Sequence, residues 1–175
     1  EKGMLAVGCA LLAIMIYIWF RFEWQFSIAA VIALGHDVIS TVGLFALASF
    51  EFNLATVAAI LTIAGYSIND TVVVFDRVRE NLRKYKSWDQ AKILNKSLNE
   101  TLSRTVMTSV TTSLALLAII IFGGAVLRDF ALAMLWGVTI GTYSSIFVAV
   151  GVISRFDLKR SDDEDNSAPV PEYER

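Results

Sequence analysis

The stretch GYSINDTVVVFDRVRENLRKY, from Gly65 to Tyr85, passes from apolar into basic residues and so predicts the end of a membrane-spanning helix. It also carries a carboxylate, Asp70, where most neighbouring side chains are hydrocarbon. An aspartate at the centre of a membrane helix costs about +2.5 to +3.5 kcal/mol on insertion scales. Such a residue is by default a candidate for function, and proton relay is one of the common uses.

The apolar residues of the chain gather in five long blocks. Of the 175 residues, 55% are hydrophobic, and the mean hydropathy is +0.58. Each block is near the ~20 residues that a helix needs to cross ~30 Å of hydrocarbon. We therefore predict an all-α integral membrane protein, a bundle of five transmembrane helices in one domain over residues 1–156. The predicted spans are 3–20, 26–50, 54–75, 106–126 and 130–153.

The basic residues predict the orientation of the bundle. Eight of the fifteen Lys and Arg lie within residues 76–104, and three more come within seven residues after the last span. If all five spans cross, both regions lie on one side of the membrane, which the positive-inside rule makes cytoplasmic. The first residues of the chain then lie on the outer, periplasmic side.

Residues outside the spans predict a connector and a tail. The segment 76–104 reads as a cytoplasmic amphipathic connector lying on the membrane surface, with a helix restart at a capping box of Ser87 and Gln90. A helix that binds a partner is the alternative. Residues 157–175 are acidic, contain two prolines and offer little apolar surface, so we expect a disordered tail.

Polar side chains inside three predicted spans form the candidate site. The second span carries a histidine and an aspartate, the third an asparagine and an aspartate, and the fourth begins with an arginine followed by threonines. The residues are His36, Asp37, Asn69, Asp70, Arg104 and Thr108. Helical spacing puts Asn69 and Asp70 on one polar stripe and Arg104 and Thr108 on another, which indicates facing surfaces or a narrow wet path.

Asp70 and Arg104 are the residues that we predict to couple to a proton. A carboxylate in a low-dielectric site binds a proton more tightly, and an adjacent cation makes it bind less tightly. A pair whose separation changes can therefore take up and release a proton, whereas a fixed pair only holds two helices together. Three alternatives stay open: a fixed Asp70–Arg104 pair, a plain membrane anchor at Arg104, and structural roles for His36 and Asp37.

No other chemistry is indicated. The chain has one histidine, one cysteine inside a span, and none of the motifs GxxxxGK[ST], HExxH, CxxC or GxSxG. We expect no enzyme, no metal or cofactor site and no nucleic-acid partner. The basic loop is expected to meet lipid head groups.

Four stretches of the chain resemble the SecF family, the smaller half of the bacterial SecDF protein-export factor in the resistance–nodulation–division (RND) superfamily. They are ALGHDVISTVGLFAL (33–47), GYSINDTVVVFDRVREN (65–81), NETLSRTVMTSVTTSLALLA (99–118) and FALAMLWGVTIGTYSSIFVA (130–149). The resemblance implies spans two to six of a six-span subunit, about half of a pseudo-symmetric RND-type domain. The first span and the periplasmic domain are then expected to be missing, which fits a chain that opens directly on a span.

The resemblance also implies a role in the bacterial inner membrane. Together with SecD and the SecYEG channel, such a subunit uses the proton-motive force to promote export of preproteins. Asp70 matches the titrating carboxylate of the family and Arg104 its cationic partner, with a further acidic residue coming from SecD. The alternative is half of an RND-type proton-coupled transporter for small molecules or lipids.

Overall fold

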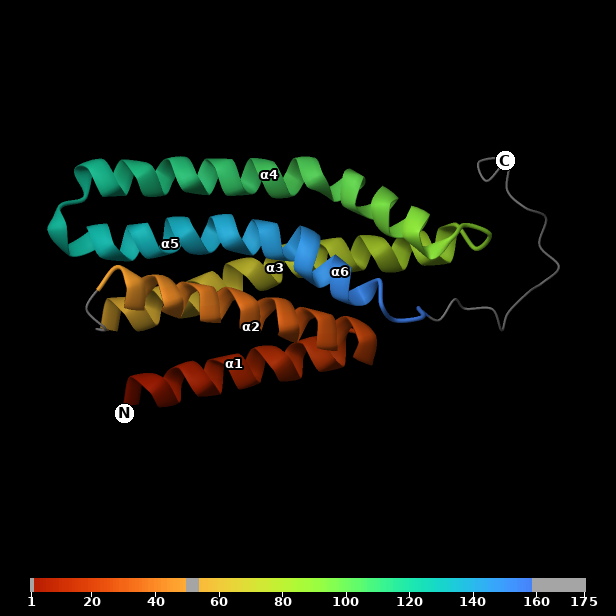
Figure 1. The fold of residues 1–175 in the computed structure, drawn as a ribbon, viewed down its shortest axis with the longest axis horizontal. Coiled ribbons are helices and arrows are strands. Elements are labelled where there is room, and N and C mark those ends of the chain that lie inside the picture. Colours follow the sequence, from red (N-terminus) through yellow and green to blue (C-terminus); the bar gives the residue numbers. More distant parts are fainter. Residues whose placement is uncertain (1, 50–53, 159–175) are drawn as a thin grey trace.

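The structure, a computed structural model, describes residues 2–49 and 54–158 as a set of long helices running side by side (Figure 1). Six α-helices and one π-helical turn make up the described chain. They are α1 (Lys2–Arg21), α2 (Trp24–Leu47), α3 (Leu54–Lys84), α4 (Gln90–Phe122), α5 (Ala125–Tyr143), the π-helical turn η1 (Ser144–Val148) and α6 (Ala149–Ile153).

The helices agree with the five predicted spans. Among the described residues, four helical segments are long and apolar enough to cross a membrane, and the N-terminal helix adds a shorter apolar segment. The last span consists of α5, η1 and α6 in sequence, because the chain stays helical from Leu127 to Ile153. The all-α bundle predicted from the sequence is confirmed.

α3 and α4 are longer than a membrane is thick. Their 31 and 33 residues correspond to about 46 and 50 Å at 1.5 Å per residue, against about 30 Å of hydrocarbon. The segment 76–104 consists of the polar ends of these two helices, which form a hairpin (Figure 1). The predicted capping box at Ser87 was wrong, because Asp89 caps α4 and accepts a hydrogen bond from Ala91 N at 3.1 Å.

Two groups of buried apolar side chains hold the bundle together. One lies toward the polar hairpin, where the rings of Phe26 and Phe75 meet edge to face with centroids 5.2 Å apart. The other lies toward the opposite end of α3 and α5 and includes Ile63 and Val138. At Gly137 the two helices approach so closely that an added Cβ would stand 2.3 Å from Ile63 Cγ1.

The small residues of α5 serve helix packing. Gly137 faces Ile63, and a Cβ on Gly141 would lie 3.2 Å from Ser67 Cβ. Small residues at such positions let membrane helices approach closely. Gly65 of α3, by contrast, has nothing within 4 Å of an added Cβ.

Glycine and a buried leucine shape the two ends of the last span. Gly124, between α4 and α5, has φ +76°, a left-handed conformation that glycine adopts without a steric penalty. At the other end, Leu158 is buried and its N–H donates to Gln90 Oε1 at 3.3 Å. The predicted tail thus begins with an ordered residue, and positions 159–175 lie outside the described residues.

Candidate functional site

Asp70 lies in the middle of α3 and faces the interior of the bundle. Its residue exposure is 5%, and its Oδ2 atom is buried with no hydrogen-bond partner among the described residues. Leaving a buried polar group unsatisfied costs about 1–3 kcal/mol, and more for a charged group. A carboxylate kept in such a position therefore needs a reason other than stability.

Three more buried polar atoms without a described partner belong to the same two helices as Asp70 and Arg104. Tyr66 Oη and Thr71 Oγ1 belong to α3, and Thr105 Oγ1 belongs to α4. Buried unsatisfied groups are few in native proteins. Their concentration on α3 and α4 marks the pair of helices that carries the candidate site.

Arg104 lies near Asp70 without pairing with it. Arg104 is exposed, and no ion pair joins it to any described residue. Its guanidinium is nevertheless close enough to act electrostatically on the Asp70 carboxylate. The structure thus holds the two charges near each other but apart, and the proton-coupling role of this pair stays a prediction.

A polar cavity of about 330 Å³ opens beside Arg104. Its lining comes from α3 and α4 and includes two arginines, three carboxylates, a threonine and a valine. The residues are Val73, Asp76, Arg77, Glu80, Glu100, Thr101 and Arg104. Val73, which follows Asp70 by about one helical turn, is the lining residue of α3 nearest to Asp70 along the chain, and the other residues of the lining on α3 belong to its polar end.

Asp37 is fully buried between α2 and α3 and has partners for both carboxylate oxygens. His36 Nδ1 lies 2.9 Å from Oδ1, and the hydroxyl of Ser67 donates to Oδ2. Thr41 also donates to the backbone carbonyl of Asp37 at 2.8 Å. These bonds are those that a structural role for Asp37 would require, and His36 lies at an exposed position, so the roles of both residues stay predictions.

Ser67 is the residue of this region that the predicted set of site residues left out. Its hydroxyl donates to Asp37 of α2, and on α3 it lies one turn before Asp70. One turn of α3 therefore separates the residue that binds Asp37 from Asp70. Ser67 also faces Gly141 of α5. The signal that would have found it is its i−3 spacing from Asp70 on the buried face of α3.

In the bundle, the residues of a predicted polar stripe do not all face the same environment. Asn69 is exposed although Asp70, the next residue, is buried. Thr108 is also exposed, and its hydroxyl donates within its own helix to the carbonyls of Arg104 and Thr105, at 3.0 and 2.9 Å. Neither residue contacts Asp70 through a hydrogen bond, so their supporting role stays a prediction.

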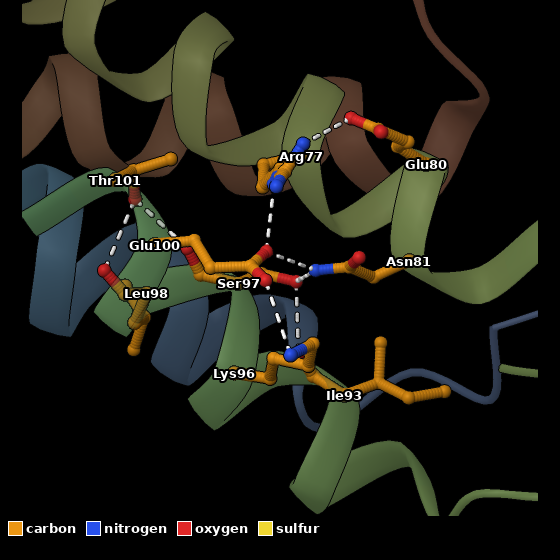
Figure 2. A network of polar contacts seen from close by, with 9 residues as sticks. All are labelled: Arg77, Glu80, Asn81, Ile93, Lys96, Ser97, Leu98, Glu100 and Thr101. Atoms are coloured by element: carbon orange, nitrogen blue, oxygen red, sulfur yellow. Dashed lines mark hydrogen bonds and ion pairs between the residues drawn. The ribbon is translucent and has the colours of Figure 1, made fainter. Parts of the chain in front are cut away.

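Beyond the apolar spans, a network of charged and polar groups clamps the ends of α3 and α4 (Figure 2). Glu100 Oε2 accepts from Arg77 Nε at 2.6 Å and from Asn81 Nδ2 at 2.9 Å. Lys96 Nζ lies 3.2 Å from the other oxygen of the same carboxylate. Asn81, which is buried, also donates to Ser97 Oγ at 2.9 Å.

Glu100 is therefore held in its charged form. The hydrogen bond from Asn81, followed by those from Arg77 and Lys96, lowers the pKa of Glu100 to about 2. The network fixes the hairpin next to the cavity that Arg104 lines. Among the described residues, no three His, Cys, Asp or Glu side chains come together as a metal site would require.

The chain is similar to proteins of bacterial protein export. Residues 1–159 match the family model described as "Protein export membrane protein SecD/SecF, C-terminal". The chain is 59% identical over 152 residues to a protein translocase subunit SecF of Rhodobacter capsulatus, covering 87% of this chain and 46% of the relative. It is 57% identical over 157 residues to the SecF of Magnetococcus marinus, covering 90% and 50%.

The fold is similar to solved structures of SecDF. The structure of SecDF from Thermus thermophilus, described as a translocon-associated membrane protein, matches with a TM-score of 0.85 and 48% identity, over 89% of this chain and 22% of that one. A SecDF structure in a super-membrane-facing form matches with a TM-score of 0.79 and 50% identity, over 83% and 20%. The chain spans about half the length of the curated relatives that it matches.

Proposed function

The chain belongs to the SecD/SecF family of protein export membrane proteins, and we propose that it forms the membrane part of a SecF subunit that couples proton movement to protein export. The proposed partners are SecD, the SecYEG channel and the preprotein in transit. The chain acts as a transport component and not as an enzyme. Asp70 is the proposed proton-binding group, and Arg104 is the proposed cation that responds to its charge.

One observation carries the proposal for the site: Asp70 is buried at membrane depth with an unpaired oxygen, and Arg104 lies near it without forming an ion pair. A carboxylate that served only to fix helix packing would be expected to be paired, as Asp37 is. An unpaired carboxylate next to a mobile cation gains or loses a proton as that cation moves.

The proton-motive force supplies enough energy for a change in the helix bundle that is driven by protonation of Asp70. A proton that moves down a potential of 100 mV releases about 2.3 kcal/mol. One or a few such steps bias two arrangements of a helix bundle, provided that the arrangements differ in proton affinity. A change in the Asp70–Arg104 separation supplies that difference, and the cavity beside Arg104 gives the side chain room to move.

The exposed polar side chains at the membrane-spanning part of α3 and α4 support a partner subunit on this face. Asn69, Arg104 and Thr108 are exposed in the isolated chain, where lipid would surround them unless another subunit covered them. Polar groups inside a membrane usually face a bundle interior or a wet cavity. We propose SecD as the covering subunit, with a further acidic residue that completes the site.

The proposed location is the bacterial inner membrane, with the first residues of the chain periplasmic and residues 76–104 cytoplasmic. The concentration of Lys and Arg in that segment supports this orientation. Half of a transporter for small molecules or lipids was the alternative, but the relatives reported above are protein translocase subunits.

The proposal is tested by translocation of a preprotein into membrane vesicles that contain the full-length protein with its partner subunits. Asp70→Asn and Arg104→Leu are each expected to abolish the stimulation of translocation by a proton gradient. Translocation that ATP drives in the absence of the gradient is expected to stay unchanged. Asp129→Asn and Arg155→Leu are matched controls, because both residues are exposed and neither lies in the site. They are expected to keep the stimulation.

Two results would contradict the proposal. Normal gradient stimulation in Asp70→Asn and Arg104→Leu, at normal protein levels, would leave only a structural role for the pair. Loss of stimulation in the two controls as well would point to a general effect on assembly.

A further inference from the structure

A second polar hollow lies next to the cavity beside Arg104, where the polar end of α3 meets the end of α1. Its volume is about 670 Å³. The lining consists of four basic and two acidic side chains: Arg21, Asp76, Arg79, Glu80, Arg83 and Lys84. It shares Asp76 and Glu80 with the cavity beside Arg104, but neither Asp70 nor Arg104 lines it, and the proposed coupling mechanism does not use its arginines.

The two acidic side chains of the hollow already have partners. Arg21 Nη2 lies 2.9 Å from both oxygens of Asp76, and Glu80 pairs with Arg77 at 2.6 Å. Arg79 and Arg83 form no ion pair with any described residue. Because they are four residues apart, they lie on the same face of α3, where two like charges repel each other. The hollow therefore carries an excess of positive charge that the described chain does not neutralise.

Two of the four cationic groups are held against an aromatic ring, whereas Arg83 is exposed. The guanidinium groups of Arg21 and Arg79 both lie over the ring of Phe22, at 5.0 and 5.6 Å from its centroid. Phe22 itself is buried, with 6% exposure. Arg79 is thus positioned in advance to bind an anion in the hollow, which reduces the entropy cost of binding.

Apolar and aromatic side chains continue from the hollow along the membrane-facing surface of α1. Trp19 and Phe20, in the last turn of this helix, are 62% and 86% exposed. Tryptophan is enriched where membrane proteins meet the head-group region. A molecule with a phosphate in the hollow and hydrocarbon beside Trp19 and Phe20 would satisfy both surfaces at once.

We propose that this hollow binds the head group of an anionic phospholipid, with its acyl chains lying along α1. Basic pockets between membrane helices are known sites for such head groups. A free phosphate would use the arginines but not the apolar surface, and it is therefore the weaker candidate. The site follows from the geometry alone, and only its assignment to the cytoplasmic leaflet rests on the orientation given under the proposed function.

The test is native mass spectrometry of the full-length protein with its partner subunits, titrated with dioleoyl phosphatidylglycerol or dioleoyl phosphatidylcholine. Each cation near an anionic lipid surface contributes roughly a fivefold gain in affinity. We therefore expect Arg79→Gln with Arg83→Gln to weaken phosphatidylglycerol binding about 25-fold and to leave phosphatidylcholine binding unchanged. The double variant Arg79→Lys with Arg83→Lys keeps both charges and should retain most of the preference.

The matched control is Lys92→Gln with Arg155→Gln, which removes two exposed cations from the same end of the bundle but outside the hollow. It is expected to bind phosphatidylglycerol like the wild type. Equal losses in the control and hollow variants would overturn the proposal in favour of general surface charge. An unchanged affinity in Arg79→Gln with Arg83→Gln would overturn it too, as would displacement of the lipid by inorganic phosphate at a similar concentration. None of these outcomes depends on translocation, so the proposal fails or holds independently of the Asp70 mechanism.

Discussion

Gly137→Ala tests the closest helix contact in the bundle. A Cβ at this position would lie 2.3, 2.4 and 2.7 Å from three side-chain carbons of Ile63, far inside normal contact distances. Ile63 is 2% exposed, so it has no free space into which it can turn. Overpacking of a filled core costs about 1–3 kcal/mol, which exceeds the gain of up to about 1 kcal/mol that alanine offers over glycine in a helix.

The assay is thermal unfolding of the full-length protein with its partner subunits in detergent, compared with the matched variant Gly43→Ala. Gly43 lies inside α2 and has nothing within 4 Å of an added Cβ, so this change should be neutral or stabilising. The double variant Gly137→Ala with Ile63→Ala should lose less stability than the two single changes combined, because alanine at position 63 lacks all three carbons that the new methyl group would meet. Equal stability of Gly137→Ala and Gly43→Ala would refute the packing of α3 against α5 described above.

The remaining predictions concern polar groups. Ser67→Ala removes the hydroxyl that donates to the buried Asp37 carboxylate, so thermal unfolding should show a loss of about 0.6–1.7 kcal/mol in the free energy of unfolding. The control is Ser113→Ala, because Ser113 has no described hydrogen bond. Equal losses of stability in the two variants would contradict the prediction. Since the folded pKa of Glu100 is about 2, below its ordinary value of 4.5, its stabilisation is complete above about pH 4.5 and disappears as the pH falls through about 2. Between about pH 5 and pH 3, the wild type should lose more thermal stability than Glu100→Gln, and parallel pH profiles would argue against the Glu100 network.

The spans could be predicted from the sequence because hydrocarbon thickness fixes how many apolar residues a helix needs. The direction of the polar ends of α3 and α4 could not be predicted, since a polar segment that follows a span looks the same whether it bends onto the membrane surface or continues straight. Contacts between α3 and α4 determine that the two polar ends continue as a hairpin. Asn81 and Glu100 tie the two extensions together, and neither residue differs in sequence from one on a solvated helix face.

The candidate site was partly predictable for a similar reason. Hydropathy marks Asp70 and Asp37 as unusual, but it does not show which of two neighbouring polar residues faces inward. Asn69 and Asp70 differ by about 100° around the helix, and the bundle buries only the aspartate. The bond from Ser67 to Asp37 was not predictable, because it depends on how α2 and α3 are rotated against each other.

The π-helical turn had no sequence signal at all. Ser144 and Ser145 are fully buried there, and Ser144 donates to the carbonyl of Ala33 at 3.3 Å, one turn before Asp37. Turns of this kind are often found at functional sites. The turn adjusts the last span so that it can pack against α2 and α3 on the side where Asp37 and Ser67 meet.

The central claim, that Asp70 binds and releases a proton, is tested most directly by pH-difference infrared spectroscopy of the full-length protein with its partner subunits in lipid. The wild type should show a protonated carboxyl band that appears and disappears with pH. Asp70→Asn should lack this band, and Asp129→Asn should retain it, because Asp129 is exposed and far along the chain from the site. A band that persists unchanged in Asp70→Asn would contradict the account.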